Sequence, residues 1–359
     1  MGIKNLYKFL KDHYPFVFQN VKVSEFSGKF VASDISGKIY AMMWGAQKKQ
    51  VEKMKDGDLD IDREKVKKEW MRMMMRIPHE LLSSGITPVF VFDGEPIPEK
   101  VNLELAKRKI EKEKKKQGLD EARAKLYIDP TNQQAMQDLR KYLANDINFA
   151  EEDIEGLFMQ YTRCGFCCIR AEDDAEKLCA ALCIQGLVDA VMSDDSDLLA
   201  FGCPTIIRGI SDTPLVEEGE DGILRSYKSF EVVRLSNVLK ELNVTYNMFL
   251  DYCILCGNDY NINIPQIGSM RAFGLILQTG RIENIYTHNT QCLNYVRSRE
   301  IFSYSPAYYN VFPINPSMTR NTDYDKYFTP LLEILPSPVS SRILDLPTYH
   351  DYDIVLIYE

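Results

Sequence analysis

Three short apolar runs in this chain each end in aspartate. Continuous, β-rich apolar runs of about four to eight residues are typical of strands buried on both faces of a sheet. The runs are KFVASD at 29–34, TPVFVFD at 87–93 and DAVMSDD at 189–195. Other segments place apolar residues at helical spacing, which predicts amphipathic helices at 39–53, 63–83, 151–163 and 173–185.

The alternation of these strands and helices predicts an α/β fold with a central, twisted, mostly parallel sheet flanked by helices. In such sheets, ligands bind at the carboxyl ends of the strands. Asp34, Asp93 and Asp195 end the three runs, so we expect them to meet at one edge. Desolvating several carboxylates together is costly unless a cation offsets their charge. The alternative for the acidic cluster at 194–197 is a solvated turn that caps the next helix.

A long insertion at 97–145 follows the second predicted strand. It is rich in Lys, Glu, Ala, Gln and Leu, with a break at YIDPTN (127–132), which predicts a helical hairpin over the strand ends. Residues 100–116 contain eight Lys or Arg and three Glu. Such a local excess indicates either a phosphate-binding strip above the acidic edge or a solvated helix face.

The pattern changes after residue 202. Residues 211–222 (SDTPLVEEGEDG) predict an acidic loop, and residues 235–260 predict two helices. Residues 261–280 (NINIPQIGSMRAFGLILQTG) predict a helix, a tight glycine turn and a second helix. The last stretch, 285–359, is rich in Tyr and Pro and has weak periodicity.

Composition describes an ordinary globular protein: the 359 residues are 45% hydrophobic and 26% charged, with a net charge of −9. No apolar run approaches the roughly 18 residues of a membrane span. Lysines interrupt the N-terminal segment, which predicts that it is no secretory signal, and Leu6 stands where a myristoylation motif has Ser or Thr. We therefore expect an intracellular protein that is not bound to a membrane.

Nine cysteines include two C-x-x-C pairs, 164/167 and 253/256. Together they could form a four-thiolate zinc site. Their apolar surroundings and the absence of a nearby histidine favour buried, reduced thiols instead. Disulfides are not expected in a reducing compartment.

Seven motifs follow one another in order and with consistent spacing: MGIKNLYKFL, ASDISGKIY, VFVFDGEPIPEK, LELAKRK, AEDDAEKLCAAL, MSDDSDLLAFG and ILCGNDY. Together they resemble the structure-specific 5′ nuclease (XPG/Rad2) family, in which the flap endonucleases are the best match. The resemblance covers about residues 1–283.

The resemblance implies the PIN-like 5′ nuclease fold and a division of the chain into five parts. These are an N-terminal nuclease region (1–96), a helical arch (97–145), an internal nuclease region (146–260), a helix–two-turn–helix that grips duplex DNA (261–284) and an extension of unknown role (285–359).

The family cleaves phosphodiesters with two Mg²⁺ ions, for which Mn²⁺ can substitute, held by a ring of carboxylates. Hard cations prefer oxygen ligands, and two ions about 4 Å apart can activate a water and stabilise the leaving oxygen. Asp174 stands where the family has Glu, one methylene shorter, with Glu172 and Asp173 as nearby substitutes; Asp194 is extra and caps the next helix. The positions that match metal ligands are Asp34, Asp93, Asp174, Glu176, Asp195, Asp197 and Asp259.

The resemblance also implies positions that contact DNA. Lys100 and Arg108 match basic residues that contact the scissile phosphate, with one extra residue between them, and would stabilise charge on its oxygens. Lys112 extends that helix face, and Tyr40 matches an aromatic residue that stacks on a base; a core-facing position is the alternative for Tyr40. The other expected DNA-binding residues are Gly2, Arg76, Gly257, Gly268 and Arg271.

The chain departs from the family at several of these positions. In the two-turn region, which binds K⁺ in the family, Gln266 replaces a glycine and Met270 a commonly basic residue. Gln47 and Ile77 replace arginines, with Arg76 as a stand-in. Neither the sliding-clamp peptide nor the basic tail of a cellular replication enzyme is evident. The resemblance therefore implies a divergent member, and a viral origin is one interpretation.

These expectations add up to a Mg²⁺-dependent, structure-specific 5′ nuclease that acts as a monomer on flapped or branched DNA. It would work in the nucleus, or in a host nucleus or cytoplasmic factory if the protein is viral. The main alternative is a 5′→3′ exonuclease of DNA or RNA with the same metal site. A glycosyltransferase that uses the DSD sequence at 195–197, or a non-catalytic nucleic-acid scaffold, is the further alternative.

Overall fold

A seven-stranded sheet forms the centre of the computed structural model, which describes residues 2–55, 57–147, 150–211, 214–218 and 224–303, with the backbone alone for 102–112 and 218. The strand order is β1-β9-β6-β5-β2-β3-β4. β2, β3, β4, β5 and β6 are parallel, and β9 runs antiparallel to β6 and β1. This confirms the predicted α/β fold. The strands are β1 (Phe18–Lys22), β2 (Phe30–Asp34), β3 (Thr87–Phe92), β4 (Cys167–Arg170), β5 (Ala190–Met192), β6 (Thr205–Ile210) and β9 (Ser229–Arg234).

The sheet is buried on both faces because its central strands carry apolar side chains at successive positions, as in Val89–Phe92 of β3. In β3, Val89 and Val91 pack into one hydrophobic core, and Phe90 and Phe92 pack into another on the opposite face. This alternation follows from the two-residue period of a strand. The continuous apolar runs of the sequence therefore correspond to strands covered on both sides.

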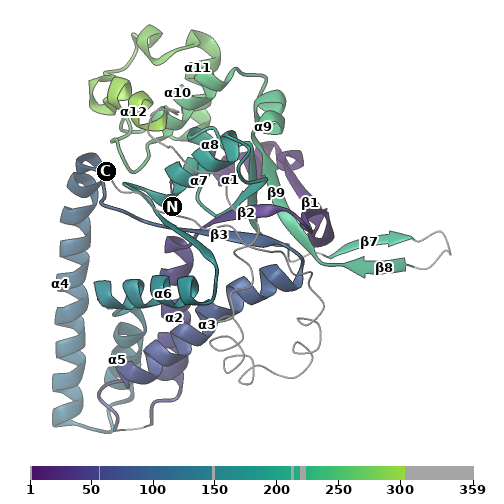
Figure 1. Ribbon diagram of the computed structural model, residues 1–359. Coiled ribbons are helices and arrows are strands. Elements are labelled where there is room, and N and C mark those ends of the chain that lie inside the picture. The colour runs from purple at the N-terminus through teal and green to yellow at the C-terminus, as the bar shows by residue number, and fades with distance from the viewer. Residues whose placement is uncertain (1, 56, 148–149, 212–213, 219–223, 304–359) are drawn as a thin grey trace, which may run out of the picture.

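Helices cover the two faces, as Figure 1 shows. On one face lie α1 (Leu6–His13), α7 (Ala175–Ile184), α8 (Asp197–Ala200), α9 (Leu235–Leu242), α10 (Tyr246–Cys256), α11 (Ser269–Thr279) and α12 (Tyr295–Phe302). On the other lie α2 (Ser36–Glu52), α3 (Arg63–Ser83), α5 (Gln133–Asn145) and α6 (Glu151–Arg163). The predicted bounds of α3 and α6 agree with the structure. Short 3₁₀ helices occur at Pro15–Val17, Val23–Phe26, Ile282–Asn284 and Gln291–Leu293.

The insertion is a helical hairpin, as predicted. Its first helix, α4 (Pro98–Ile128), begins beside the sheet edge and runs along one side of the molecule before α5 returns (Figure 1). The turn between them ends at Asn132, whose side chain accepts a hydrogen bond of 3.0 Å from the Ala135 N–H and caps α5. Buried Gln47 of α2 donates hydrogen bonds to the Leu143 and Asp146 carbonyls. The residue that replaces a family arginine here thus fastens the hairpin to α2.

The acidic loop predicted at 211–222 is partly wrong. Within it, β7 (Leu215–Glu218) pairs antiparallel with β8 (Leu224–Tyr227). Glu217 pairs with Lys22 of β1, and the Lys22 ammonium lies 4.4 Å from the centre of the Tyr227 ring. The sequence LVEE lacks the apolar alternation of a half-buried strand, so the strand was not predicted. The hairpin is stabilised by pairing between β7 and β8 and by contacts with β1, rather than by a buried face.

The helix predicted at the start of 261–280 is also wrong. Residues 261–268 form turns, and the first helix of the two-turn region is α10. The Asn261 side chain accepts a hydrogen bond from the Asn258 N–H and donates one of 2.9 Å to the Ile254 carbonyl at the end of α10. These local side-chain bonds satisfy the backbone without a helix. The division of the chain at 261 stays a prediction.

Gln266 lies in this turn at φ 66°, a left-handed conformation that favours glycine. Gln266→Gly is therefore expected to raise the free energy of unfolding by roughly 0.5–1 kcal/mol, because left-handed backbone costs an L-residue about 1–2 kcal/mol. Denaturant unfolding measures the change. Exposed Ile262, whose φ is negative, is the matched control: Ile262→Gly should destabilise the chain. Equal destabilisation by both substitutions would show that the turn does not strain Gln266.

The nine cysteines are free, as predicted. Cys164 packs in the core on one face of the sheet and Cys167 against the core on the other, so this pair cannot chelate one ion. Cys253 and Cys256 are buried in α10, and burial raises the pKa of both thiols. In the described ranges, no helix is long and apolar enough to span a membrane.

Candidate metal centre

The aspartates that end the apolar runs meet at one edge of the sheet, as the sequence predicts. Asp34 is the last residue of β2 and pairs in register with Val91, two residues before Asp93. On the other side of β2, Ser33 pairs with Met192, three residues before Asp195. Because these strands are parallel neighbours, their carboxyl ends carry all three side chains to the same place.

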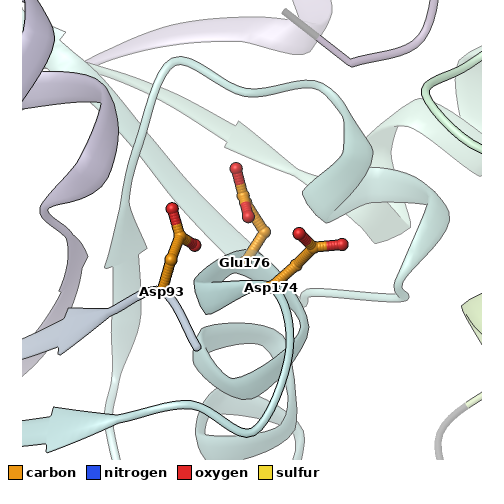
Figure 2. A group of neighbouring side chains, drawn as sticks. All are labelled: Asp93, Asp174 and Glu176. Atoms are coloured by element: carbon orange, nitrogen blue, oxygen red, sulfur yellow. The ribbon is translucent and has the colours of Figure 1, made fainter. Parts of the chain in front are cut away.

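Asp93, Asp174 and Glu176 form a compact group, whose carboxylate oxygens lie within 4.8 Å of one another (Figure 2). Asp174 precedes α7 and Glu176 lies in its first turn, where the helix dipole favours negative charge. The Asp93 carboxylate accepts a hydrogen bond of 2.9 Å from the Ala175 N–H. In the described part of the chain, this is the one group found in which three Asp, Glu, His or Cys residues have ligand atoms this close together.

Gly94 makes the close approach between β3 and the segment before α7 possible. A Cβ atom at this position would lie 2.1 Å from the Ala171 carbonyl oxygen. The Gly94 N–H donates to the Asp173 carbonyl at 2.8 Å. The role of Gly94 was missed in the sequence, although a glycine directly after a strand-terminal aspartate is a signal of close backbone approach.

A second group of carboxylates is joined by hydrogen bonds. The Ser193 hydroxyl donates to Asp34 at 3.2 Å and accepts from the Asp195 N–H at 3.1 Å. Asp195 in turn accepts from the Asp197 N–H at 2.9 Å. One oxygen of Asp197, Oδ1, is buried and has no hydrogen-bond partner in the described structure. Ser193 was missed in the sequence, although it lies between the strand and the acids.

The two groups share one electrostatic environment. Burial, together with the charges of Asp93 and Asp195, raises the pKa of Asp34 to about 7. Burial also raises the pKa of Glu176 and Asp197 well above the ordinary range, with Asp34 acting on the first and Asp195 and Asp259 on the second. Asp34, Glu176 and Asp197 thus resist ionisation because of their burial and their neighbours. The structure brings the predicted residues together; their role as metal ligands stays a prediction.

Lys100 brings positive charge into this ring. Its ammonium lies 2.5 Å from Asp174 Oδ1. Burial lowers the pKa of Lys100, but the charges of Asp174, Glu176 and Asp93 outweigh it and raise the pKa. The Tyr260 hydroxyl donates to the other Asp174 oxygen at 2.6 Å. Both oxygens of the shorter Asp174 side chain are therefore oriented by the protein, and Tyr260, the last letter of GNDY, is a site residue that sequence reasoning missed.

The two substitutes for Asp174 are used elsewhere. Glu172 is exposed, and its carbonyl accepts a hydrogen bond from the Glu95 N–H. Asp173 forms an ion pair of 2.6 Å with Lys177 on α7. The geometry thus supports Asp174, rather than Glu172 or Asp173, as the residue at the position where the family has Glu.

Asp194 does not cap a helix, so that expectation is wrong. Ser196 precedes α8 and makes no side-chain cap, whereas the Asp194 side chain is 61% exposed. It forms ion pairs with Lys38 at 3.7 Å and Arg208 at 3.8 Å. These two cations hold Asp194 away from the buried ring.

Gly2 lies against the acidic ring in left-handed backbone, with φ 82°. A Cβ atom here would lie 2.0 Å from Asp195 Oδ1, 2.8 Å from Ser196 Oγ and 2.9 Å from the Asp197 nitrogen. The N-terminus therefore needs glycine to pass this site, a reason that is independent of DNA.

The other expected DNA-binding residues lie outside the ring. Tyr40 is 50% exposed, which excludes the core-facing alternative. Arg76, Gly268 and Arg271 are also exposed. Their contacts with DNA stay predictions.

The remaining predicted DNA-contacting positions are Gly257, Arg108 and Lys112. Gly257 is buried at φ 86°, and a Cβ atom on it would lie 2.8 Å from the Asn263 side chain. The side chains of Arg108 and Lys112 lie outside the described residues. Of the described residues of the predicted basic strip, Lys100 lies at the acidic edge, and Lys114, Lys115 and Lys116 are exposed farther along α4.

Two family models match the chain: the XPG N-terminal domain at residues 1–116 and the XPG I-region at residues 165–259. The chain is 33% identical to flap endonuclease 1 from Cryptosporidium muris (strain RN66), over 84% of this chain and 62% of the relative. It is also 33% identical to flap endonuclease 1 from Zea mays, over 79% of this chain and 69% of the relative. The chain thus spans about two thirds of the length of these relatives.

Solved structures share the fold. Flap endonuclease-1 from Methanococcus jannaschii matches with a TM-score of 0.52 and 19% identity, over 79% of this chain and 81% of that chain. The catalytic core of Rad2 in complex with DNA substrate matches with a TM-score of 0.51 and 19% identity, over 91% and 85%. Motifs, sheet order and relatives agree: the chain belongs to the XPG/Rad2 family, together with the flap endonucleases.

Proposed function

We propose that this chain is a Mg²⁺-dependent, structure-specific 5′ nuclease that hydrolyses phosphodiester bonds at 5′ flaps or branched DNA. The observation that carries the proposal is the ring of carboxylates from separate strand ends, with Lys100 at its border, in a member of the XPG/Rad2 family. A glycosyltransferase would use residues 195–197, and this function would give no role to Asp34 at the end of β2 or to Asp93 after β3. A scaffold would have no need of so many buried, mutually repelling carboxylates.

The residues fit two divalent cations. The donor set is all oxygen, which Mg²⁺ prefers. Burial, with the neighbouring carboxylates, raises the pKa values of Asp34, Glu176 and Asp197, and bound cations would offset the cost of ionising them. The unpartnered Asp197 Oδ1 is a buried acceptor that needs a donor or a cation. The residues that would hold the ions are Asp34, Asp93, Asp174, Glu176, Asp195, Asp197 and Asp259.

When bound, two Mg²⁺ ions would supply an activated water and neutralise charge on the leaving oxygen. The chain's own residues supply orientation. Ser193 fixes the Asp34 carboxylate, and Tyr260 fixes that of Asp174. Lys100 stays charged at any working pH because its carboxylate neighbours raise its pKa, so it offers a fixed cation to the scissile phosphate.

The proposal extends to DNA outside the metal centre. Tyr40, half-exposed on α2, would stack on a base, and the turns between α10 and α11 would contact the duplex backbone with a bound K⁺. Branched DNA as partner, action as a monomer and a nuclear location, or a viral factory in a host cell, follow from the same proposal.

Cleavage of labelled substrates tests the function. The purified chain is incubated with Mg²⁺ and a 5′-labelled flap, a nicked duplex, a Holliday junction or single-stranded RNA. We expect cutting near the flap base that leaves a 5′-phosphate and a 3′-hydroxyl and stops on adding EDTA. Stepwise release of short products from 5′ ends, of RNA in particular, would favour the exonuclease alternative, and no cutting of any DNA would refute the proposal.

Mg²⁺ is expected to stabilise the fold, and more at pH 8 than at pH 5.5. Because the pKa of Asp34 rises from an ordinary 3.8 to about 7 on folding, its contribution to metal-free stability falls as pH rises through that window. At pH 8 the ionised site has no protons to displace. Saturation at about 100 times Kd should then raise Tm by roughly 5 °C.

Differential scanning fluorimetry with and without MgCl₂ measures this shift. KCl at the same ionic strength controls for general screening of charge. Equal Tm shifts with the two salts, or an equal Mg²⁺ effect at both pH values, would count against a metal site built from these carboxylates.

A further inference from the structure

Helix α12 belongs to the extension whose role the sequence leaves open. It contacts Tyr260, a partner of Asp174, and Glu99, the residue before the other partner, Lys100. We infer that α12 is a brace that positions Lys100 and Asp174, and that Arg297 is its positioning residue. This inference rests on the proposed nuclease function. Figure 1 shows α12 next to the start of α4, at the end of the molecule that carries α8 and α10.

The first contact is with Glu99, the residue before Lys100. Arg297 Nε of α12 lies 2.8 Å from Glu99 Oε1, in the first turn of α4. Glu99 directly precedes Lys100, and the hydrogen bond from Arg297 lowers the pKa of Glu99. The pair therefore joins two charges across elements that are distant in sequence. The ion pair holds the first turn of α4 at Glu99, the residue before Lys100, whose ammonium contacts Asp174.

The second contact reaches Asp174 through Tyr260. The ring of Phe302, the buried last residue of α12, lies 5.4 Å from the Tyr260 ring and 4.9 Å from the Phe201 ring. Aromatic packing at such distances fixes ring orientation. Tyr260 donates to Asp174, and Phe201 follows α8, which begins at Asp197. Phe302 thus packs against Tyr260, which orients the Asp174 carboxylate, and against Phe201, which follows the helix that begins at Asp197.

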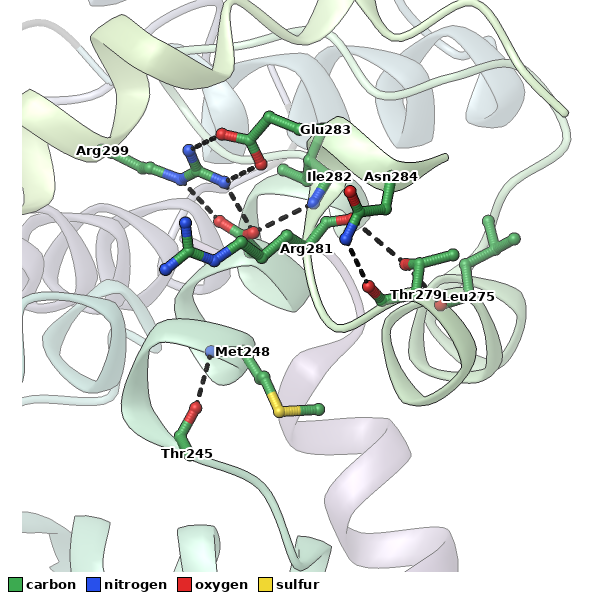
Figure 3. A network of polar contacts seen from close by, with 10 residues as sticks. Thr245, Met248, Leu275, Thr279, Arg281, Ile282, Glu283, Asn284 and Arg299 are labelled. Carbon is green, nitrogen blue, oxygen red and sulfur yellow. Dashed lines mark hydrogen bonds and ion pairs between the residues drawn. The ribbon is translucent and has the colours of Figure 1, made fainter. Parts of the chain in front are cut away.

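The brace is itself anchored to the two-turn region. Arg299 makes two charged hydrogen bonds to buried Asp251 of α10, of 2.7 and 2.6 Å, and two to Glu283, of 2.5 and 2.9 Å. Asp251 also accepts from the Ile282 N–H at 3.1 Å. Figure 3 shows the Arg299 guanidinium facing the Glu283 carboxylate. This bidentate network fixes α12 relative to α10, so Arg297 and Phe302 act from a rigid support.

Arg297 is suited to a test because it is 45% exposed, so that its loss should leave the fold intact. Arg297→Ala is expected to lower the single-turnover rate of flap cleavage roughly 10-fold, as loss of a supporting residue does, with unchanged Kd for the flap. Glu300, the other ion partner of Arg297 at 3.2 Å, provides the matched control. Glu300→Gln should leave the rate unchanged.

Two further variants separate positioning from general damage. The charge swap Glu99→Arg with Arg297→Glu should restore the rate to within about 2-fold, because the pair is rebuilt in reverse. In a Lys100→Ala background, Arg297→Ala should slow cleavage no further. A swap that fails to restore the rate, or a loss that persists without Lys100, would overturn the inference.

The outcomes for the two proposals are distinguishable. If the wild-type chain cuts flaps and Arg297→Ala cuts them equally fast, the brace is refuted and the nuclease function stands. If the wild-type chain cuts no DNA, the proposed function fails, and the inference about its catalytic residues fails with it.

Discussion

Asp195→Asn is expected to lower the single-turnover rate of flap cleavage on the order of 10³-fold or more, a loss of about 4 kcal/mol of transition-state stabilisation. Asp195 lies at the centre of the ring, where it accepts from the Asp197 N–H and faces the charge of Asp34. Asn keeps the shape and the hydrogen-bond acceptor but removes the charge that a metal ion needs. Single-turnover cleavage at saturating enzyme measures the chemical step.

Asp194 provides the control, because it has the same side chain one residue away. It is exposed and paired with Lys38 and Arg208. Asp194→Asn should change the rate by less than about 3-fold, since exposed ion pairs contribute little. Equal losses in the two variants would show that general negative charge, rather than the buried ring, supports cleavage.

Stability should change in the opposite sense to activity. Burial raises the pKa of Asp195, so its ionised form is disfavoured in the fold. Without metal, Asp195→Asn should therefore keep or raise Tm at pH 8. A large fall in metal-free Tm would mean that the loss of cleavage reports unfolding.

Gly2→Ala is the second large effect, with an expected loss of flap cleavage of roughly 10²-fold. The added Cβ atom would lie 2.0 Å from Asp195 Oδ1 in a backbone conformation that L-residues rarely adopt. The N-terminal segment must then move, or Asp195 must turn away from the ring. Either shift displaces a carboxylate that the chemistry needs in place.

Gly156 in α6 is the matched control, because a Cβ atom there would meet nothing within 4 Å. Gly156→Ala should leave cleavage unchanged and stabilise the chain by about 1 kcal/mol through helix propensity. Cleavage rates and denaturant unfolding of the two variants are compared. Full activity of Gly2→Ala would show that the N-terminus does not constrain the ring.

The acidic edge was predictable because its signal is local. Asp34, Asp93 and Asp195 each end an apolar run, and parallel strands must bring such ends together. The bounds of α3 and α6 were predictable for the same reason, since helical periodicity is a pattern among residues three and four positions apart.

The parts that sequence reasoning missed depend on contacts between distant segments. Ser193 and Tyr260 matter only because the fold brings Asp34 and Asp174 to them. The β7–β8 hairpin has no apolar alternation, and the turns at 261–268 rely on the Asn261 side chain rather than on periodicity. Strand pairing and side-chain capping of this kind leave little pattern in a single sequence.

The central claim is that carboxylates from separate strand ends form one site for two divalent ions. Anomalous scattering from a crystal grown with Mn²⁺ tests it most directly. The account predicts two Mn²⁺ ions about 4 Å apart, one beside the group of Asp93, Asp174 and Glu176 and one beside Asp195 and Asp197. A crystal with no Mn²⁺ among these side chains, or with ions bound only elsewhere on the surface, would contradict it.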